Sequence, residues 1–247
     1  MYNGSAMHPQ RKLSEIAARI LILLLGLFIL AQGIAFTILA DLGTDAITSP
    51  ALVAHKVLGV KEEGMGYEFC SVGNLVICVH MLLVLMQIAL LRSKYNPLQL
   101  LQVVMGIILG TMLNVCIIYT SKLPCPGFEA SIGYTLVGCV LSAFGIYTFV
   151  KADLVPLSAE GLCLALSSTF KWRFSRVKVA VDCTLVIIAV IASLLIFHTI
   201  VGVGIGTVIC AVSTGYIIGL FFKHCPLWDK VLASIGGGSA TASSDLS

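Results

Sequence analysis

The sequence predicts an all-α polytopic membrane protein with six transmembrane helices, two short helices and two pseudo-symmetric repeats. Three observations predict this fold class. Hydrophobic residues make up 58% of the 247 residues and charged residues 11%, whereas a soluble domain carries about 25% charged residues. Six apolar segments have the length of about 20 residues that a helix needs to cross a bilayer. One sequence pattern also occurs twice along the chain.

The six apolar segments share this length and carry few charges. They are Ile16–Ala40, Val72–Leu91, Leu98–Tyr119, Ile132–Val150, Val179–Phe197 and Ile200–Phe222. Two further segments, Gly43–Val60 and Val155–Phe170, are shorter and carry charged groups such as Asp45 and Glu160. A charge at the membrane centre costs about 2.5–3.5 kcal/mol on the insertion scale. We therefore expect half-length or re-entrant helices that are buried among the six spans.

Eight full spans are the alternative arrangement. Both arrangements place most Lys and Arg residues on the side of the termini, so the positive-inside rule puts both termini in the cytoplasm without separating the two. The expected organisation is a cytoplasmic tail (residues 1–15), a first membrane repeat (16–120), a second membrane repeat (131–223) and a disordered tail (236–247) that is rich in Gly, Ser, Ala and Thr.

The repeat is visible in two stretches of 17 residues. Residues 26–42 read GLFILAQGIAFTILADL and residues 138–154 read GCVLSAFGIYTFVKADL, and they are identical at seven positions. Apolar spans share Gly, Ala and Ile by composition alone, but both stretches also place Ala-Asp-Leu at the same distance from two matched glycines. With three spans in each half, the second repeat is inverted relative to the first. Inverted repeats are common in transporters, where the solute site lies near the membrane midplane between them.

The first half of the chain has a recognisable order of features: a Gly-rich first span, the acidic loop Ala40–Ser49, a short helix and a following Leu-Gly-Thr span. This pattern resembles the YczE/YyaS/YitT group of bacterial integral membrane proteins. Members commonly show a cluster of Gly, Pro/Trp and Asp in the first loop, which Gly43, Asp45 and Pro50 match in part, while the Trp is absent. The resemblance covers most of residues 20–222. It implies a multi-pass architecture in the cytoplasmic (inner) membrane of a bacterium rather than a mechanism.

Asp41 and Asp153, in the two Ala-Asp-Leu motifs, are the leading candidates for a solute site. If the chain re-enters the membrane after each motif, the short helices begin near the midplane. Their N-termini then suit an anionic group, and the Asp carboxylates suit a cation or a proton. The alternative is that each Asp caps its short helix at the membrane surface. Further candidates for the same cavity, or for the headgroup level, are Asp45, Thr44, Thr48 and Ser49 in the first half and Ser158 and Glu160 in the second.

Several other residues have a structural interpretation. Polar side chains on apolar spans commonly join helices, and here they are Asn74, His80, Gln87 and Asn114. Lys178 and Asp182 have the spacing of an i,i+4 ion pair. The pairs Gly106/Gly110 and Gly202/Gly206 are expected to pack the third span of each half against its partner. Cys70 and Cys125 lie in predicted loops, and a disulfide between them requires that both loops face the outside.

The expected function is transport or facilitated passage of a small polar solute or ion, with the site between the repeats. The alternatives are a non-transporting membrane regulator or scaffold, and a substrate-binding subunit energised by separate ATPase partners. The expected partners are membrane lipids, the solute and possible further copies of the chain. No motif indicates an enzyme, a cofactor, a metal site or nucleic-acid binding.

Overall fold

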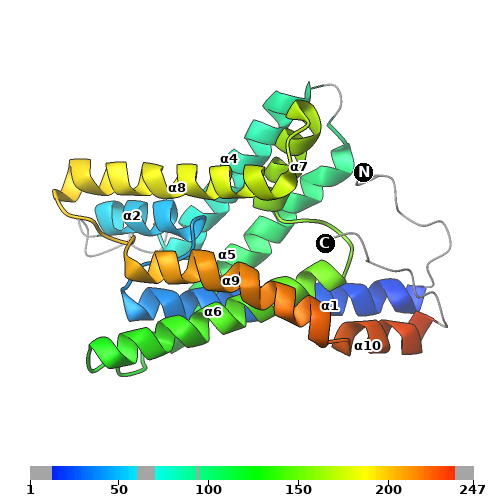
Figure 1. Cartoon of the computed structure of the whole chain (residues 1–247), viewed down its shortest axis with the longest axis horizontal. Coiled ribbons are helices and arrows are strands. Elements are labelled where there is room, and N and C mark those ends of the chain that lie inside the picture. The colour runs from blue at the N-terminus through cyan, green and yellow to red at the C-terminus, as the bar shows by residue number, and fades with distance from the viewer. Residues whose placement is uncertain (1–12, 60–69, 93–94, 237–247) are drawn as a thin grey trace.

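The computed structural model describes residues 13–59, 70–92 and 95–236, and these residues form helices and connections. Six of the described helices are long and apolar enough to cross a membrane. They are α1 (Leu13–Ala40), α4 (Val72–Leu91), α5 (Leu101–Thr120, preceded by the 3-10 turn Pro97–Leu100), α6 (Phe128–Lys151), α8 (Phe174–Phe197) and α9 (Ile205–His224) (Figure 1). The prediction of a helical chain with six long apolar segments is confirmed.

The starts of α8 and α9 differ most from those of their apolar runs. Helix α8 begins at Phe174 rather than Val179, because its basic first turns carry the i,i+4 pair of Lys178 with Asp182 (3.0 Å) and remain helical. Helix α9 begins at Ile205 rather than Ile200. The residue Gly202 has a φ of +74°, a left-handed conformation that interrupts the helix before this point.

Two shorter helices follow the first long helix of each half. Helix α2 (Thr48–Gly59) has 12 residues and α7 (Ser158–Phe170) has 13. At 1.5 Å per residue they are roughly 18 and 20 Å long, which is less than the hydrocarbon core of about 30 Å. Their first turns lie beside a central cavity, because Thr48 and Glu160 both line it.

Helices α1 and α6 form the centre of the molecule. Their backbones approach closely at glycines: a Cβ added to Gly26 would lie 2.5 Å from the nitrogen of Phe149, and one added to Gly138 would lie 3.2 Å from the nitrogen of Thr37. The contact moves backwards along α6 as it moves forwards along α1, so the two helices are antiparallel (Figure 1). Glycines of both repeat stretches therefore let the two helices approach closely.

The remaining helices pack around this pair. Helix α5 packs on α1 and α9 on α6, while each short helix contacts the second span of the other half, α2 on α8 and α7 on α4. Helices α4 and α5 are joined by Asn114, whose amide donates to Asn74 Oδ1 (3.2 Å) and whose Oδ1 accepts from the Gly73 N–H (2.8 Å). These amides therefore join helices as the sequence predicts.

The glycine pairs of the third spans differ between the halves. Gly106 and Gly110 face α4, as expected. Gly206 instead donates its N–H to the Leu42 carbonyl (2.8 Å) in the connection after α1, and Gly202 precedes α9 and lies against side chains of α2. The expectation that the second pair packs the third span on its neighbouring span is therefore wrong, because the chain is not helical at Gly202.

Further predictions concern the loops and the ends of the chain. Cys70 and Cys125 are free thiols, so the structure contains no disulfide between them. The predicted tails fall largely on residues 1–12 and 237–247, which lie outside the described residues. A further helix, α10 (Leu227–Gly236), was not expected from the sequence. It is held to α6 by Lys151–Asp229 (2.7 Å) and by a hydrogen bond from the Trp228 ring N–H to Thr148 (3.1 Å).

Candidate functional site

A central cavity lies between the two halves. Its lining comes from α1, α4, α5, α6 and α9 and from the first turns of α2 and α7. The lining residues are Leu30, Ile34, Thr37, Asp45, Ile47, Thr48, Val76, His80, Leu109, Ser142, Ile146, Leu157, Glu160, Cys210 and Thr214. Most of them are apolar, and two carboxylates, the His80 imidazole and a few hydroxyl groups supply the polarity.

Asp45 precedes α2 and contributes one carboxylate. Its Oδ2 accepts hydrogen bonds from the backbone N–H groups of Ile47 (3.2 Å) and Thr48 (3.3 Å), so Asp45 caps α2. Its Oδ1 is buried and has no hydrogen-bond partner. Asp45 lies in the connection between α1 and α2, and its side chain is held at the start of α2 by these two hydrogen bonds.

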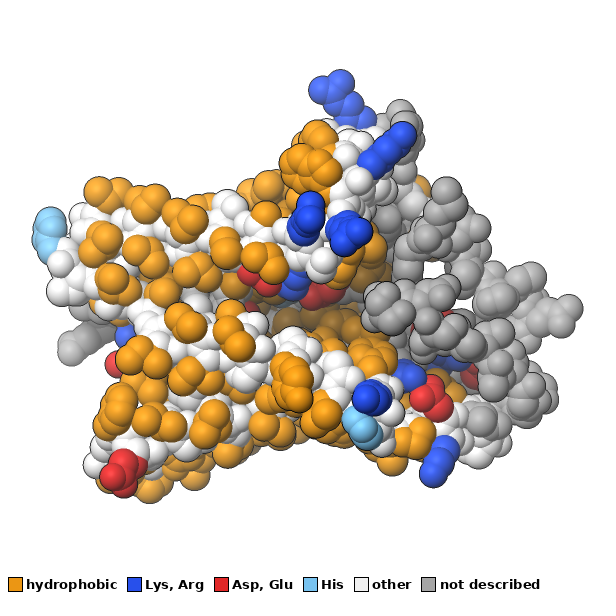
Figure 2. All heavy atoms as spheres, viewed as in Figure 1, with side chains coloured by type: hydrophobic (Ala, Val, Ile, Leu, Met, Phe, Trp, Pro, Cys, Tyr) orange, Lys and Arg blue, Asp and Glu red, His pale blue; other side chains and the backbone are white. Residues whose placement is uncertain are grey.

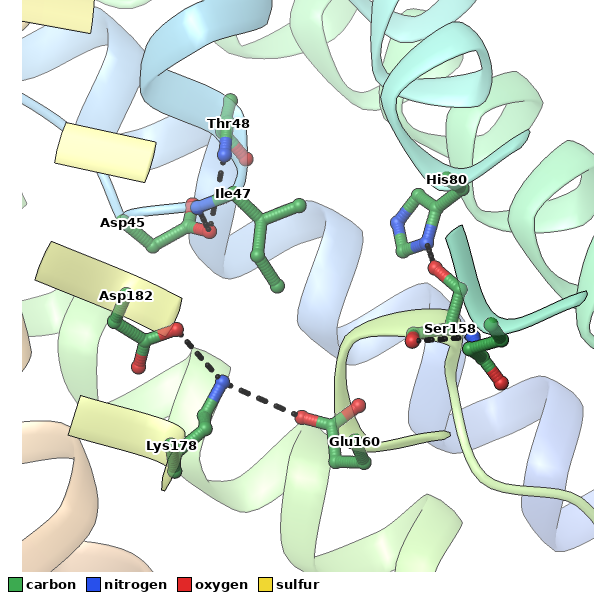
Figure 3. Close-up of polar contacts among 9 residues, drawn as sticks. Asp45, Ile47, Thr48, His80, Ser158, Glu160, Lys178 and Asp182 are labelled. Atoms are coloured by element: carbon green, nitrogen blue, oxygen red, sulfur yellow. Dashed lines mark hydrogen bonds and ion pairs between the residues drawn. The ribbon is translucent and has the colours of Figure 1, made fainter. Parts of the chain in front are cut away.

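Glu160, in the first turn of α7, contributes the other carboxylate. Its Oε1 lies 3.7 Å from Lys178 Nζ on α8, and its Oε2 is buried without a hydrogen-bond partner. Lys178 also binds Asp182 at 3.0 Å, so the predicted i,i+4 pair is confirmed and extends to Glu160. In Figure 3, Lys178 lies between Asp182 and Glu160, with Asp45 on the opposite side of Asp182.

His80 and Ser158 connect α4 to the start of α7. His80 Nδ1 and Ser158 Oγ are 2.6 Å apart, and the Ser158 carbonyl accepts from Gln87 Nε2 (2.9 Å) (Figure 3). Gln87 Nε2 also donates to Gln102 on α5 (3.0 Å). The roles of His80 and Gln87 in joining helices are therefore confirmed, and His80 also lines the cavity. Ser158 was expected to line it but is fully buried and positions α7 instead.

Thr44 and Ser49 were further candidates for the cavity, and both are fully buried, Thr44 in the connection and Ser49 in the first turn of α2. The Ser49 hydroxyl donates to the Asp45 carbonyl (2.9 Å), and the Thr44 and Ser49 hydroxyls are 3.4 Å apart. These contacts fix the turn that presents Asp45. Of this group, Asp45 and Thr48 reach the cavity.

The structure does not bring Asp41 and Asp153 together. They follow the last residues of α1 and α6, with φ values of +51° and +49° that end each helix. Because α1 and α6 are antiparallel, these ends lie on opposite sides of the molecule (Figure 1). The Asp41 side chain is 72% exposed and pairs with Lys56 (2.9 Å), and Asp153 is also exposed. Neither residue lines the central cavity.

These features define an α-helical protein with six helices fit to span a membrane and a small acidic cavity between its halves. The chain belongs to the family of unknown function DUF6198, whose model matches residues 17–223. The description of this family does not name the YczE/YyaS/YitT group, so that resemblance stays an expectation. Comparisons with curated proteins and with solved structures gave no match.

Proposed function

We propose that this protein transports a small polar solute or ion across the bacterial cytoplasmic membrane and that the central cavity is its binding site. The observation that carries the proposal is the pair of buried carboxylate oxygens without partners, on Asp45 and Glu160, beside a cavity inside a bundle of apolar helices. Ionisable groups at membrane depth are costly, and they commonly mark the path of a substrate or an ion.

An inverted repeat supports this function. The contact of Gly26 with Phe149 and that of Thr37 with Gly138 are related by the same shift of 112 residues that carries Gly26 to Gly138 in the sequence alignment. The exchanged packing of α2 on α8 and α7 on α4 follows the same relation. Such inverted repeats allow the two halves to exchange conformations around a fixed central site.

The two short helices are then re-entrant. Each follows a connection, residues 41–47 or 152–157, that leads from the end of a long helix back to the cavity, and each runs outward again (Figure 1). Non-helical backbone is tolerated at membrane depth where protein or a water-filled cavity covers it. In this arrangement the first turns of α2 and α7 form opposite parts of one binding site.

Both termini are then cytoplasmic. Helix α1 begins and α9 ends on the same side of the molecule (Figure 1). Lys56 and Lys122 lie toward the opposite side, whereas the basic start of α8 lies on the side of the termini. The excess of basic residues on one side satisfies the positive-inside rule.

The test is solute uptake by proteoliposomes. A panel of labelled solutes is first screened for thermal stabilisation of the purified protein, and the stabilising solutes are then assayed for uptake. We expect Asp45→Asn and Glu160→Gln to reduce the initial rate at least tenfold. The Asn variant should fold, because Asn caps helices about as well as Asp.

Asp41→Asn and Asp153→Asn are the matched controls, because these exposed carboxylates lie away from the cavity, and both variants should keep the wild-type rate. Equal rates in all four variants would remove the cavity from the mechanism. A protein that takes up no solute but purifies with a stoichiometric partner would favour the regulator or scaffold instead.

A further inference from the structure

We infer that the ligand of this cavity is a small organic cation, an ammonium group carried on an apolar body. This inference rests on the proposed function and names the class of solute that the same site takes. It is supported by three features: the charge around the cavity, the occupation of the α2 N-terminus by Asp45, and the apolar lining.

The charge around the cavity is unbalanced. Asp45, Glu160 and Asp182 bring three carboxylates, and Lys178 is the ammonium that contacts this group within the described part of the chain. Lys178 lies closer to Asp182 (3.0 Å) than to Glu160 (3.7 Å). Asp45 therefore remains without a cationic partner among the described residues.

Two specific atoms need a donor. Asp45 Oδ1 and Glu160 Oε2 are both buried and unpaired, and an ionised carboxylate accepts hydrogen bonds but cannot donate them. A buried charge that lacks a partner is destabilising, and an N–H donor with a positive charge satisfies both requirements. A protonated amine supplies this group, and a quaternary ammonium supplies the charge alone.

The N-terminus of α2, where an anion would bind, is already occupied by the Asp45 carboxylate. A helix N-terminus offers free N–H groups to an anion, but here those of Ile47 and Thr48 donate to Asp45 Oδ2. An anionic ligand at this end of the cavity would displace a residue of the chain and would meet its negative charge. The first turn of α7 also places a carboxylate, Glu160, at the cavity.

The apolar lining argues against a small inorganic cation. Leu30, Ile34, Val76, Leu109 and Ile146 form much of the wall. Ca²⁺ takes six to eight oxygen ligands and Mg²⁺ six, and no group of three or more His, Cys, Asp or Glu residues in the described ranges is placed to hold a metal ion. An organic cation instead buries its carbon atoms against this wall while its charge faces the carboxylates.

Helices α8 and α9 are consecutive in the chain but do not pack along their lengths, unlike α4 and α5 in the first half. Figure 2 shows a hollow on this face, with acidic and basic side chains at its bottom and hydrophobic side chains along its rims. A cation with an apolar body is compatible with both parts of this hollow.

The test compares three probes that share one ring: cyclohexylammonium, cyclohexanol and cyclohexanecarboxylate. Binding to the purified protein in detergent is measured by calorimetry at pH 7, with NaCl, KCl and MgCl₂ as inorganic comparisons. We expect saturable binding of the ammonium compound, at least tenfold tighter than that of the other two, and at least tenfold weaker in Asp45→Asn and in Glu160→Gln. Asp41→Asn should bind like the wild type.

The outcomes separate this inference from the proposed function. Equal or tighter binding of the alcohol or the carboxylate, saturation by an inorganic cation alone, or no saturable binding of cyclohexylammonium would overturn the organic cation. Cation binding that depends on the cavity carboxylates without any flux in proteoliposomes would keep the inference and reject transport. Flux of a neutral or anionic solute that depends on the same carboxylates would keep transport and reject the organic cation.

Discussion

Asp45 uses its two carboxylate oxygens for different purposes. Oδ2 caps α2 through the N–H groups of Ile47 and Thr48, and Oδ1 stays unpaired beside the cavity. The Asp45 side chain is therefore held by the fold while one acceptor remains available. Preorganisation of this kind lowers the cost of ordering a binding group when the ligand arrives.

The His80–Ser158 hydrogen bond should contribute to stability, because it is buried and links α4 to α7. Ser158→Ala or His80→Ala leaves its partner buried and unpaired, which costs about 1–3 kcal/mol. We expect the double variant to lose less free energy of unfolding than the sum of the single variants, measured by denaturant unfolding in detergent. Ser121→Ala, at an exposed hydroxyl, is the control and should change stability by less than about 0.5 kcal/mol. Strictly additive losses would show that the two groups do not interact.

The sequence identified part of the cavity at the level of residues. Asp45, Thr48 and Glu160 were candidates and line it, because charged or hydroxyl groups in short apolar segments must be covered by protein. The choice of Asp41 and Asp153 assumed that both bends point inward. Helical periodicity does not define the direction of a non-helical connection, and the left-handed Asp at each helix end turns the carboxylate outward.

At the scale of elements, the α1–α6 crossing holds the two halves together. Its glycines let the backbones touch, which increases packing between helices in a membrane, where burial away from water contributes little. The bounds of the long helices were predictable from hydropathy to within a few residues. Helix α10 was not, because its 10 residues are too few for a span and it depends on contacts with α6 and α1.

Gly145→Ala should loosen this crossing. The added Cβ would lie 2.5 Å from the backbone nitrogen of Leu30, so the two helices must move apart, and such overpacking costs about 1–3 kcal/mol. Gly133→Ala on the same helix is the matched control, because nothing lies within 4 Å of its added Cβ, and the gain in helix propensity favours it by up to about 1 kcal/mol. Thermal unfolding in detergent should show a lower midpoint for Gly145→Ala only. Equal midpoints would mean that the α1–α6 contact is looser than described.

At the scale of the whole molecule, the two halves share one plan but differ in detail. Helices α4 and α5 pack closely, whereas α8 and α9 diverge on the side of the hollow. If the two halves are the inverted repeat proposed above, they exchange such differences when the site changes its side of access, and the asymmetry then belongs to one of two related states. The sequence alone could not reveal it, because the predicted repeats imply equal halves.

The six-span topology can be tested by labelling introduced cysteines, in a variant whose native cysteines are replaced by Ala and whose unfolding midpoint is first checked. With six spans and cytoplasmic termini, Lys122 lies outside while Arg92 and Lys151 lie inside. With eight spans these positions are reversed. A membrane-impermeant maleimide should therefore label Lys122→Cys in intact cells. It should label Arg92→Cys and Lys151→Cys only after the cells are permeabilised. The reverse pattern would show that α2 and α7 cross the membrane, against their lengths of 12 and 13 residues, and would make the repeats parallel rather than inverted.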